Sequence, residues 1–232
     1  MVEIKGLEKF APKDFPGHMS ATIFTGECNF RCPFCHNADL VLNPKSIPDF
    51  PLDFFLSFLD ARKDWLEAIC ITGGEPLIHE DLDILLQVIK ERDFLVKVDT
   101  NGSFPLRLKG FIKKKLVDFV AMDIKAPLER YQEITKSNVK IADIRTSIDL
   151  IRTSGVPYVF RTTVVPGLFQ VEDIEKIGEL LKESDHFQLQ NFVPENTIDK
   201  SYMQKTPFSK KEFKEFADSA KKYFKKVSVE GD

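Results

Sequence analysis

The sequence has few cysteines and no long apolar run. Four of its 232 residues are cysteine, and they show no disulfide pattern, so we expect a reducing, cytoplasmic setting. The opening residues lack the apolar core of a signal peptide, and no later stretch approaches the length of a membrane span. A net charge of −3 provides no basic field for nucleic acid. We therefore expect neither a membrane nor a nucleic acid as a partner.

The sequence also lacks a composition break that would divide it. Hydrophobic residues make up 43% and charged residues 30%, which is ordinary for a globular chain that buries a substantial core. We find no repeat and no low-complexity tract. The longest loop-like segments, 43–48 and 194–207, follow strand ends and could approach a substrate. Residues 1–232 are therefore predicted to form a single domain.

Three of the four cysteines lie within eight residues, as Cys28, Cys32 and Cys35. Thiolates are soft ligands that suit iron–sulfur clusters, and a four-iron cube offers four metal corners. Three ligands leave one iron open for a group that is not protein. Spacing alone also permits a structural zinc site, completed by His36. Cys70 lies in an apolar run and is predicted to be a core residue rather than a fourth ligand.

Short apolar strands alternate with amphipathic helices along the chain. Alternation of this kind favours a parallel sheet with right-handed crossovers. The chemistry-bearing segments recur directly after strands, which is where parallel barrels keep their active sites. An open, doubly wound sheet is the alternative that the pattern leaves open. The predicted strands are 20–25, 67–72, 94–99, 118–123, 158–165 and 187–193, and the predicted helices are 52–63, 81–92, 141–151, 171–181 and 213–224.

Two motifs resemble those of the radical S-adenosylmethionine (SAM) superfamily. The cysteine run has the superfamily's C-x3-C-x-aromatic-C form, with Phe34 as the aromatic residue, and Gly73-Gly74-Glu75-Pro76 matches its G-G-E-P segment. The resemblance implies a 4Fe–4S cluster held by the three cysteines, with SAM chelated at the open iron. It also implies that the G-G-E-P segment contacts the methionine amino group. The expected fold is an α/β, partial (β/α)6 TIM-type barrel of parallel strands.

Within that superfamily, the sequence resembles the activases of glycyl radical enzymes. The matching segments are 14–17, 23–27 and His36-Asn37, and the pattern is closest to the activating protein of anaerobic ribonucleoside-triphosphate reductase. The resemblance implies reductive cleavage of SAM to a 5′-deoxyadenosyl radical, which takes a hydrogen from a glycine of the partner enzyme. A flavodoxin- or ferredoxin-type electron donor is implied as well. Glu27 departs from the pattern, which usually has glycine before the first cysteine.

Four further residues match the pattern of pyruvate formate-lyase activase. Asp99 and Asp123 stand in its D-T-N-G and D-L-K segments, followed by Lys125, and Arg161 lies on a later strand. The resemblance implies that the two aspartates help to hold a monovalent cation beside the methionine carboxylate. Turn capping by Asp99 and pairing of Asp123 with Lys125 are the simpler reading. Asn196 replaces a histidine of that relative, so the histidine's role is not carried over.

Two other functions stay open on the sequence. One is a radical SAM enzyme that acts on a small molecule, and the other is a noncatalytic scaffold that binds zinc or a cluster. No second group of cysteines follows residue 70, which counts against the branches that use auxiliary clusters. Hydrogen abstraction needs no general acid or base, so we assign no such catalytic residue.

Overall fold

The computed structural model describes residues 2–230. Within them, the backbone forms one eight-stranded sheet whose strands lie in chain order. The strands are β1 (Ile4–Glu8), β2 (Ser20–Thr25), β3 (Ala68–Gly73), β4 (Leu95–Thr100), β5 (Phe119–Asp123), β6 (Tyr158–Val164), β7 (His186–Asn191) and β8 (Lys226–Glu230).

The strand directions identify the fold as an open, barrel-like α/β structure. Each strand from β3 to β8 pairs in parallel with the strand before it, whereas β1 runs antiparallel to β2 along the edge. A doubly wound sheet reverses its strand order at a switch point, and no reversal occurs here. The predicted partial barrel of parallel strands is confirmed, and the doubly wound alternative is wrong. The sheet does not close, because β1 and β8 form its two ends.

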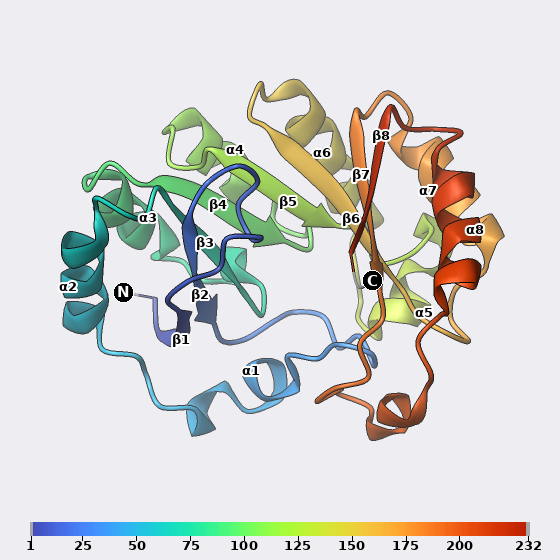
Figure 1. Ribbon diagram of the computed structural model, residues 1–232, viewed down its shortest axis with the longest axis horizontal. Helices are drawn as coiled ribbons and strands as arrows, with labels where there is room; N and C mark the ends of the chain where they lie inside the picture. Colours follow the sequence, from blue (N-terminus) through green and yellow to red (C-terminus); the bar gives the residue numbers. More distant parts are fainter. Residues whose placement is uncertain (1, 231–232) are drawn as a thin grey trace.

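Helices lie around the outside of this curved sheet, from α2 at one end to α8 at the other (Figure 1). Each predicted helix is present, with ends that shift by a few residues. Capping boxes start α7, from Gln170 and Asp173, and α8, from Ser209 and Glu212. The helices are α1 (Ala38–Leu42), α2 (Leu52–Arg62), α3 (Leu82–Lys90), α4 (Pro105–Lys113), α5 (Tyr131–Thr135), α6 (Ile141–Thr153), α7 (Val171–Leu181) and α8 (Lys210–Ala220).

The two faces of the sheet have different chemistry. Outward side chains pack against the helices in the main hydrophobic core. The inner face carries a smaller apolar cluster, in which Phe15, from the loop before β2, packs with Cys70 and Phe119. Cys70 is 1% exposed, so its assignment to the core is confirmed. Farther along the same strands the inward positions become polar, which places the charged residues beside the strand ends.

The structure contains elements that the sequence pattern did not predict. β8 adds a seventh parallel strand where six were expected, and β1 adds an antiparallel edge. Helix α4 was also missed, as were the short helices α1 and α5. The last predicted helix ends earlier than expected, at Ala220, but Phe224 still stacks on Phe187 with ring centroids 4.6 Å apart.

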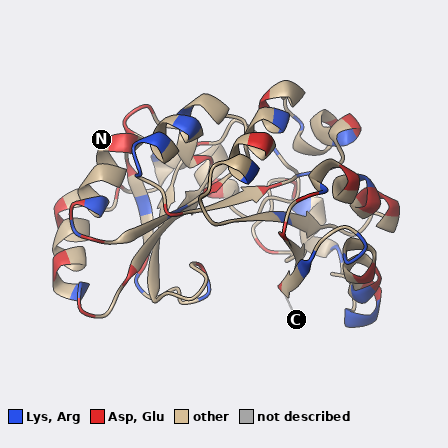
Figure 2. Cartoon of the chain, turned by 90° about the horizontal axis from the view of Figure 1, so that it is seen from above, with Lys and Arg blue, Asp and Glu red and all other residues tan. Residues whose placement is uncertain are grey.

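Positively and negatively charged residues are mixed along the outer helices, as the colours of Figure 2 show. This distribution agrees with the small net charge of −3. Among residues 2–230, no helix combines the length and the apolar character that crossing a membrane requires.

Candidate active site

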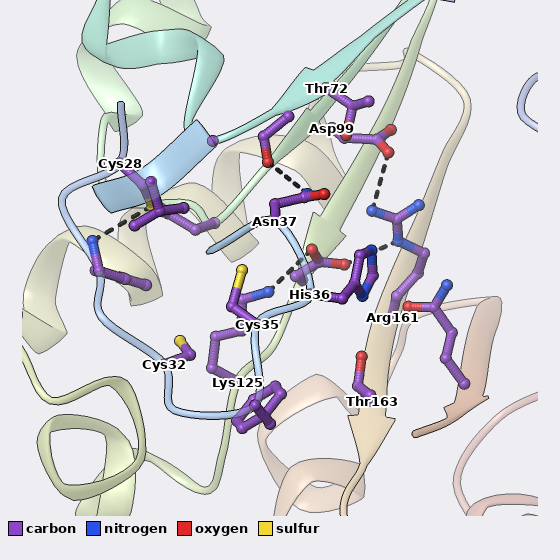
Figure 3. Close-up of a pocket in the computed structure, with 18 of the residues that line it drawn as sticks. Cys28, Cys32, Cys35, His36, Asn37, Thr72, Asp99, Lys125, Arg161 and Thr163 are labelled. Carbon is purple, nitrogen blue, oxygen red and sulfur yellow. Dashed lines mark hydrogen bonds and ion pairs between the residues drawn. The ribbon is translucent and has the colours of Figure 1, made fainter. Parts of the chain in front are cut away.

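A cavity of about 550 Å³ opens beside the carboxyl ends of the parallel strands. The three cysteines of the predicted cluster loop line it, together with residues from the ends of β3 to β7 (Figure 3). Every residue that the sequence proposed for the site borders this cavity except Glu75. The predicted site residues that border the cavity are Cys28, Cys32, Phe34, Cys35, Gly73, Gly74, Asp99, Asp123, Lys125 and Arg161.

Local hydrogen bonds and buried aromatic rings hold the cysteine loop. The Cys35 amide donates to the Cys32 carbonyl at 3.0 Å, and the Phe30 amide donates to Cys28 Sγ at 3.4 Å. Phe34 is 6% exposed and packs into the main core. The aromatic position of the motif therefore anchors the loop while the thiols on either side face the cavity (Figure 3).

The thiols lie in a poorly solvated environment. Burial raises the pKa of Cys28 to about 11 and that of Cys32 to about 12. The nearby ammonium of Lys125 acts to lower the pKa of Cys32, but its effect is smaller than the increase that burial causes. Because metals bind thiolates, loading this loop with iron releases protons. Three thiols that border one cavity match, in number and in ligand type, a four-iron cluster that keeps one iron free of protein ligands.

The glycine pair at the end of β3 allows two backbone segments to touch. Gly73 has φ +112°. The backbone N–H of the next residue, Gly74, donates to the Thr25 carbonyl at 2.9 Å. A side chain on Gly74 would overlap the carbonyl oxygen of Glu27, at the entry to the cysteine loop. Glycine is required at this close approach because it has no Cβ.

The backbone conformation at Glu27 accounts for the glycine that is usual at this position of the activase pattern. Its φ of +61° lies in the left-handed region, which glycine adopts at little cost. Its carbonyl accepts from the Glu75 amide at 2.8 Å, which ties the cysteine loop to the G-G-E-P segment. The Glu27 side chain is exposed and borders a second cavity with Lys5 and Pro44, apart from the cysteine-lined cavity.

Glu75 joins the ends of β3 and β4 instead of bordering the cavity. Its Oε2 accepts from the Asn101 amide at 2.6 Å, and its Oε1 accepts from the Thr100 hydroxyl at 2.8 Å and the Leu77 amide at 3.1 Å. Burial raises the pKa of Glu75 to about 7, although these hydrogen bonds favour the charged form. Through these contacts the carboxylate positions the D-T-N-G turn relative to the glycine pair.

The two aspartates of the site are paired with cationic side chains. Arg161 lies between the two aspartates, with Nη2 at 3.1 Å from Asp99 Oδ2 and Nε at 2.8 Å from Asp123 Oδ1. Lys125 Nζ lies 3.1 Å from Asp123 Oδ2, which is the simple pairing that the sequence suggested. Burial alone would raise the pKa of both aspartates, but the positive charges of Arg161 and of a neighbouring lysine, Lys97 for Asp99 and Lys125 for Asp123, together outweigh burial and hold both pKa values below their usual range.

Sequence analysis did not single out two asparagines of the site. Asn37 Nδ2 donates to the Gly73 carbonyl at 2.8 Å, and Asn101 Nδ2 lies 3.9 Å from Cys28 Sγ. Both asparagines lie within motifs that carried the resemblance. Their position in those motifs could therefore have identified them as site residues from the sequence. Asn196, in contrast, does not border the cavity and donates to Asp39 Oδ2 at 3.0 Å.

The loop after β7 contacts the back of the cysteine loop. The Ile198 amide donates to the Cys35 carbonyl at 3.1 Å, and the Asp199 amide donates to the Pro33 carbonyl at 2.9 Å. We call residues 197–199 the latch. The latch joins segments that lie about 160 residues apart in the chain. It lies within segment 194–207, one of the two loop-like segments that the sequence analysis considered able to approach a substrate.

A comparison with known families matches residues 22–181 to the model of the Radical SAM superfamily. This chain therefore belongs to the radical SAM superfamily. The superfamily uses a 4Fe–4S cluster and SAM, and the cavity brings the required thiols together. The alternatives of a zinc site and of a noncatalytic scaffold are set aside on this ground.

Curated relatives extend the similarity over nearly the whole chain. A protein of Methanocaldococcus jannaschii, provisionally named a glycyl-radical enzyme activating enzyme, is 34% identical over 97% of this chain and 95% of its own length. The pyruvate formate-lyase-activating enzyme of Listeria monocytogenes is 25% identical, with 85% of each chain covered.

Solved structures share the fold at low sequence identity. Streptococcus suis SuiB, in its SAM-bound crystal structure, superposes with a TM-score of 0.69 and 17% identity over 88% of this chain. This chain spans about half of SuiB, 48% of its length. A domain of pyruvate-formate lyase-activating enzyme from Bacteroides vulgatus gives a TM-score of 0.57 at 16% identity and covers 71% of this chain and 99% of that domain.

Proposed function

We propose that this chain is a glycyl radical enzyme activase, built as a single radical SAM domain that works in the cytoplasm. The observation that carries the proposal is the full-length similarity to the archaeal relative, at 34% identity over 97% of the chain. The chain's four cysteines leave no set for an auxiliary cluster beyond the cysteine loop. A radical SAM segment with one cysteine group agrees with an activase better than with the peptide-modifying branches, which use extra clusters.

We assign each site residue a role that its position supports. Cys28, Cys32 and Cys35 hold the cluster, and Phe34 anchors their loop. The backbone of Gly73 and Gly74 leaves room for the methionine part of SAM, and Glu75 positions the neighbouring turn. When bound, the cluster and SAM together supply a carbon radical that removes a hydrogen atom from a glycine α-carbon. The cationic side chains of Lys125 and Arg161 orient the anionic methionine carboxylate.

A peptide substrate is supported by the cavity wall at the end of β7. Asn191 Nδ2 donates to the Phe208 carbonyl at 2.8 Å, but Asn191 Oδ1 is buried and has no hydrogen-bond partner among residues 2–230. A buried acceptor without a donor costs about 1–3 kcal/mol. Asn191 borders the cavity, so a rotation of its side chain would let a backbone N–H of an entering glycine loop supply that donor. Glycine lets a backbone enter such a site because it lacks a side chain.

The finer proposal names the partners. The sequence pattern favours anaerobic ribonucleoside-triphosphate reductase as the glycyl radical enzyme and a flavodoxin- or ferredoxin-type protein as the electron donor. Both assignments depend on the resemblance of the motifs, since recognition of partners lies in surface loops.

Isotope transfer tests the proposal directly. The candidate reductase is prepared with α-deuterated glycine and incubated anaerobically with the reconstituted protein, reductant and SAM. We expect mass spectrometry to find one deuterium in the 5′-deoxyadenosine that forms. Product without deuterium, alongside an intact reductase, would contradict a glycine substrate while leaving SAM cleavage in place. Asn191→Ala should lower deuterium transfer more than it lowers total 5′-deoxyadenosine.

A further inference from the structure

Each oxygen of the two carboxylates that the resemblance implies as ligands of a monovalent cation already pairs with a positive side chain. Asp99 Oδ2 and Asp123 Oδ1 both pair with Arg161, at 3.1 and 2.8 Å, and Asp123 Oδ2 pairs with Lys125 at 3.1 Å. The fourth oxygen, Asp99 Oδ1, pairs with Lys97. Each carboxylate oxygen that could ligate a cation therefore already faces a positive side chain. We call these five residues the charge ladder.

Lys97 reaches Asp99 because the two residues share a face of β4. Side chains two positions apart on a strand point the same way, and the register places Lys97 beside Cys70 and Phe119 on the inner face. The Lys97 side chain is 4% exposed. Asp99 borders the cavity whereas Lys97 does not, so the ammonium lies beneath the cavity floor. Lysine is almost never this buried without a partner.

The charge count disfavours an additional cation. The ladder contains three cationic side chains and two carboxylates, which leaves one net positive charge at the floor of the cavity. An alkali ion would add a second positive charge and would have to displace Lys97 or Arg161 from a carboxylate. A tethered ammonium loses no translational freedom when it pairs, whereas a free ion does. Without Lys97, one oxygen of the buried Asp99 would be unpaired, and a hard cation would then suit it.

We propose that Lys97 is a built-in substitute for the monovalent cation, so that this chain binds SAM without one. The expected cation site does not fit the residues present, and the lysine supplies the positive charge that the site needs. The inference concerns the SAM site, which follows from family membership, and does not depend on the identity of the hydrogen donor. Failure of the activase proposal would leave it unaffected.

The first test measures SAM binding in different salts at constant ionic strength. Anaerobic calorimetry on the reconstituted protein compares sodium, potassium and choline chlorides. We expect the dissociation constants to agree within about twofold, because no site discriminates among the cations. An affinity that falls by about tenfold or more in choline would overturn the proposal. This measurement uses the wild-type protein, so it tests the proposal even if substitution of the buried lysine prevents folding.

The second test creates the missing cation site. Lys97→Met removes the charge while keeping an unbranched side chain of similar length, which leaves Asp99 Oδ1 unpaired. We expect SAM binding by this variant to weaken in choline by about tenfold and to recover in sodium or potassium. Lys97→Arg should retain the salt independence of the wild type. Lys90→Met is the matched control: Lys90 pairs with Asp118 at 2.7 Å outside the cavity, and its loss should leave SAM binding unchanged.

A third readout follows the ion itself and needs neither cluster nor SAM. Titration of the cluster-free protein with sodium, followed by ²³Na line broadening, should give no saturable binding for the wild type or Lys90→Met and saturable binding for Lys97→Met. Saturable binding by the wild type that disappears in Asp99→Asn would show that the carboxylate holds an alkali ion after all, which contradicts the inference. Salt-independent SAM binding by a folded Lys97→Met variant would also contradict it.

Discussion

At the scale of single residues, glycines set the approach of the cysteine loop to the sheet. Gly74→Ala should disrupt this approach, since its Cβ would overlap the carbonyl oxygen of Glu27. We expect destabilisation of about 2 kcal/mol and a lower iron content after reconstitution, measured by urea unfolding and by iron analysis. The matched control is Gly110→Ala, because a Cβ there meets no atom within 4 Å and lies within α4. The free energy of unfolding of this control variant should increase by up to about 1 kcal/mol, because alanine favours a helix more than glycine does. Equal iron content in both variants would contradict a structural role for Gly74.

Glu27 offers a residue-scale prediction of the opposite sign. Its backbone lies at φ +61°, in the region that disfavours residues with a Cβ. Glu27→Gly should therefore stabilise the folded protein by about 0.5 kcal/mol, after the entropy that glycine adds to the unfolded chain is subtracted. Thermal unfolding of the cluster-free protein measures this change. A destabilised variant would mean that the Glu27 side chain makes a favourable contact that outweighs the backbone cost.

At the scale of secondary-structure elements, the charge ladder joins β4, β5 and β6 in a pH-dependent way. The pKa values of Asp99 and Asp123 lie below their usual value near 3.8, because Arg161 and the neighbouring lysines outweigh burial. A carboxylate whose folded pKa is depressed stabilises the fold above its unfolded pKa and loses that contribution as the pH falls. The contribution of these two carboxylates to the free energy of unfolding should therefore be present in full above about pH 4 and should decline below that pH.

Urea unfolding between pH 5 and pH 3 checks this prediction. Asp123→Asn should be less stable than the wild type at pH 5 and should lose less stability on acidification, because one depressed carboxylate is gone. Asp53→Asn, on the exposed face of α2, should keep the pH dependence of the wild type. If Asp123→Asn shows the same loss as the wild type, the ladder does not contribute to acid sensitivity.

The latch is the second feature at the element scale. Thr197 is fully buried, and its hydroxyl donates to the Asp199 carbonyl at 2.8 Å, which shapes the turn that presents the two latch amides. Thr197→Val removes this hydrogen bond at nearly constant volume. We expect the Ile198 and Asp199 amides to exchange with solvent roughly tenfold faster. Thr146→Val, which removes an exposed hydroxyl bond on α6, should leave their exchange unchanged. Unchanged exchange in Thr197→Val would mean that the latch is held by its backbone alone.

At the scale of the whole molecule, the sequence predicted the parallel sheet well because its strands are buried on both faces. The central runs, such as 67–72 against the observed Ala68–Gly73, differ by about one residue. The edges were missed for physical reasons. β8 reads Lys-Val-Ser-Val-Glu and is half exposed, and β1 contains a lysine and a glycine within five residues. Helix α4 carries a glycine and three basic residues, which weaken its apolar periodicity.

The motifs predicted which residues form the site, but they predicted only some of the ion pairs among those residues. The sequence identified Asp99, Asp123 and Arg161 but left two readings of the aspartates open: ligands of a monovalent cation, or a turn cap at Asp99 and a partner of Lys125 at Asp123. The missing signal was Lys97, which lies two residues before Asp99 and must share its face of the strand. Which cations reach which carboxylate depends on neighbouring strands that pair in space, and the pairing of β4 with β5 and of β5 with β6 supplies that information.

Electron paramagnetic resonance on the complete anaerobic mixture tests the central claim most directly. The mixture contains the reconstituted protein, reductant, SAM and a candidate glycyl radical enzyme of the host. The account predicts a glycine-type doublet that grows with time and is absent when Cys32→Ala replaces the wild-type protein. Production of 5′-deoxyadenosine with no doublet on any candidate would contradict the activase function and would indicate a different substrate for the same radical chemistry.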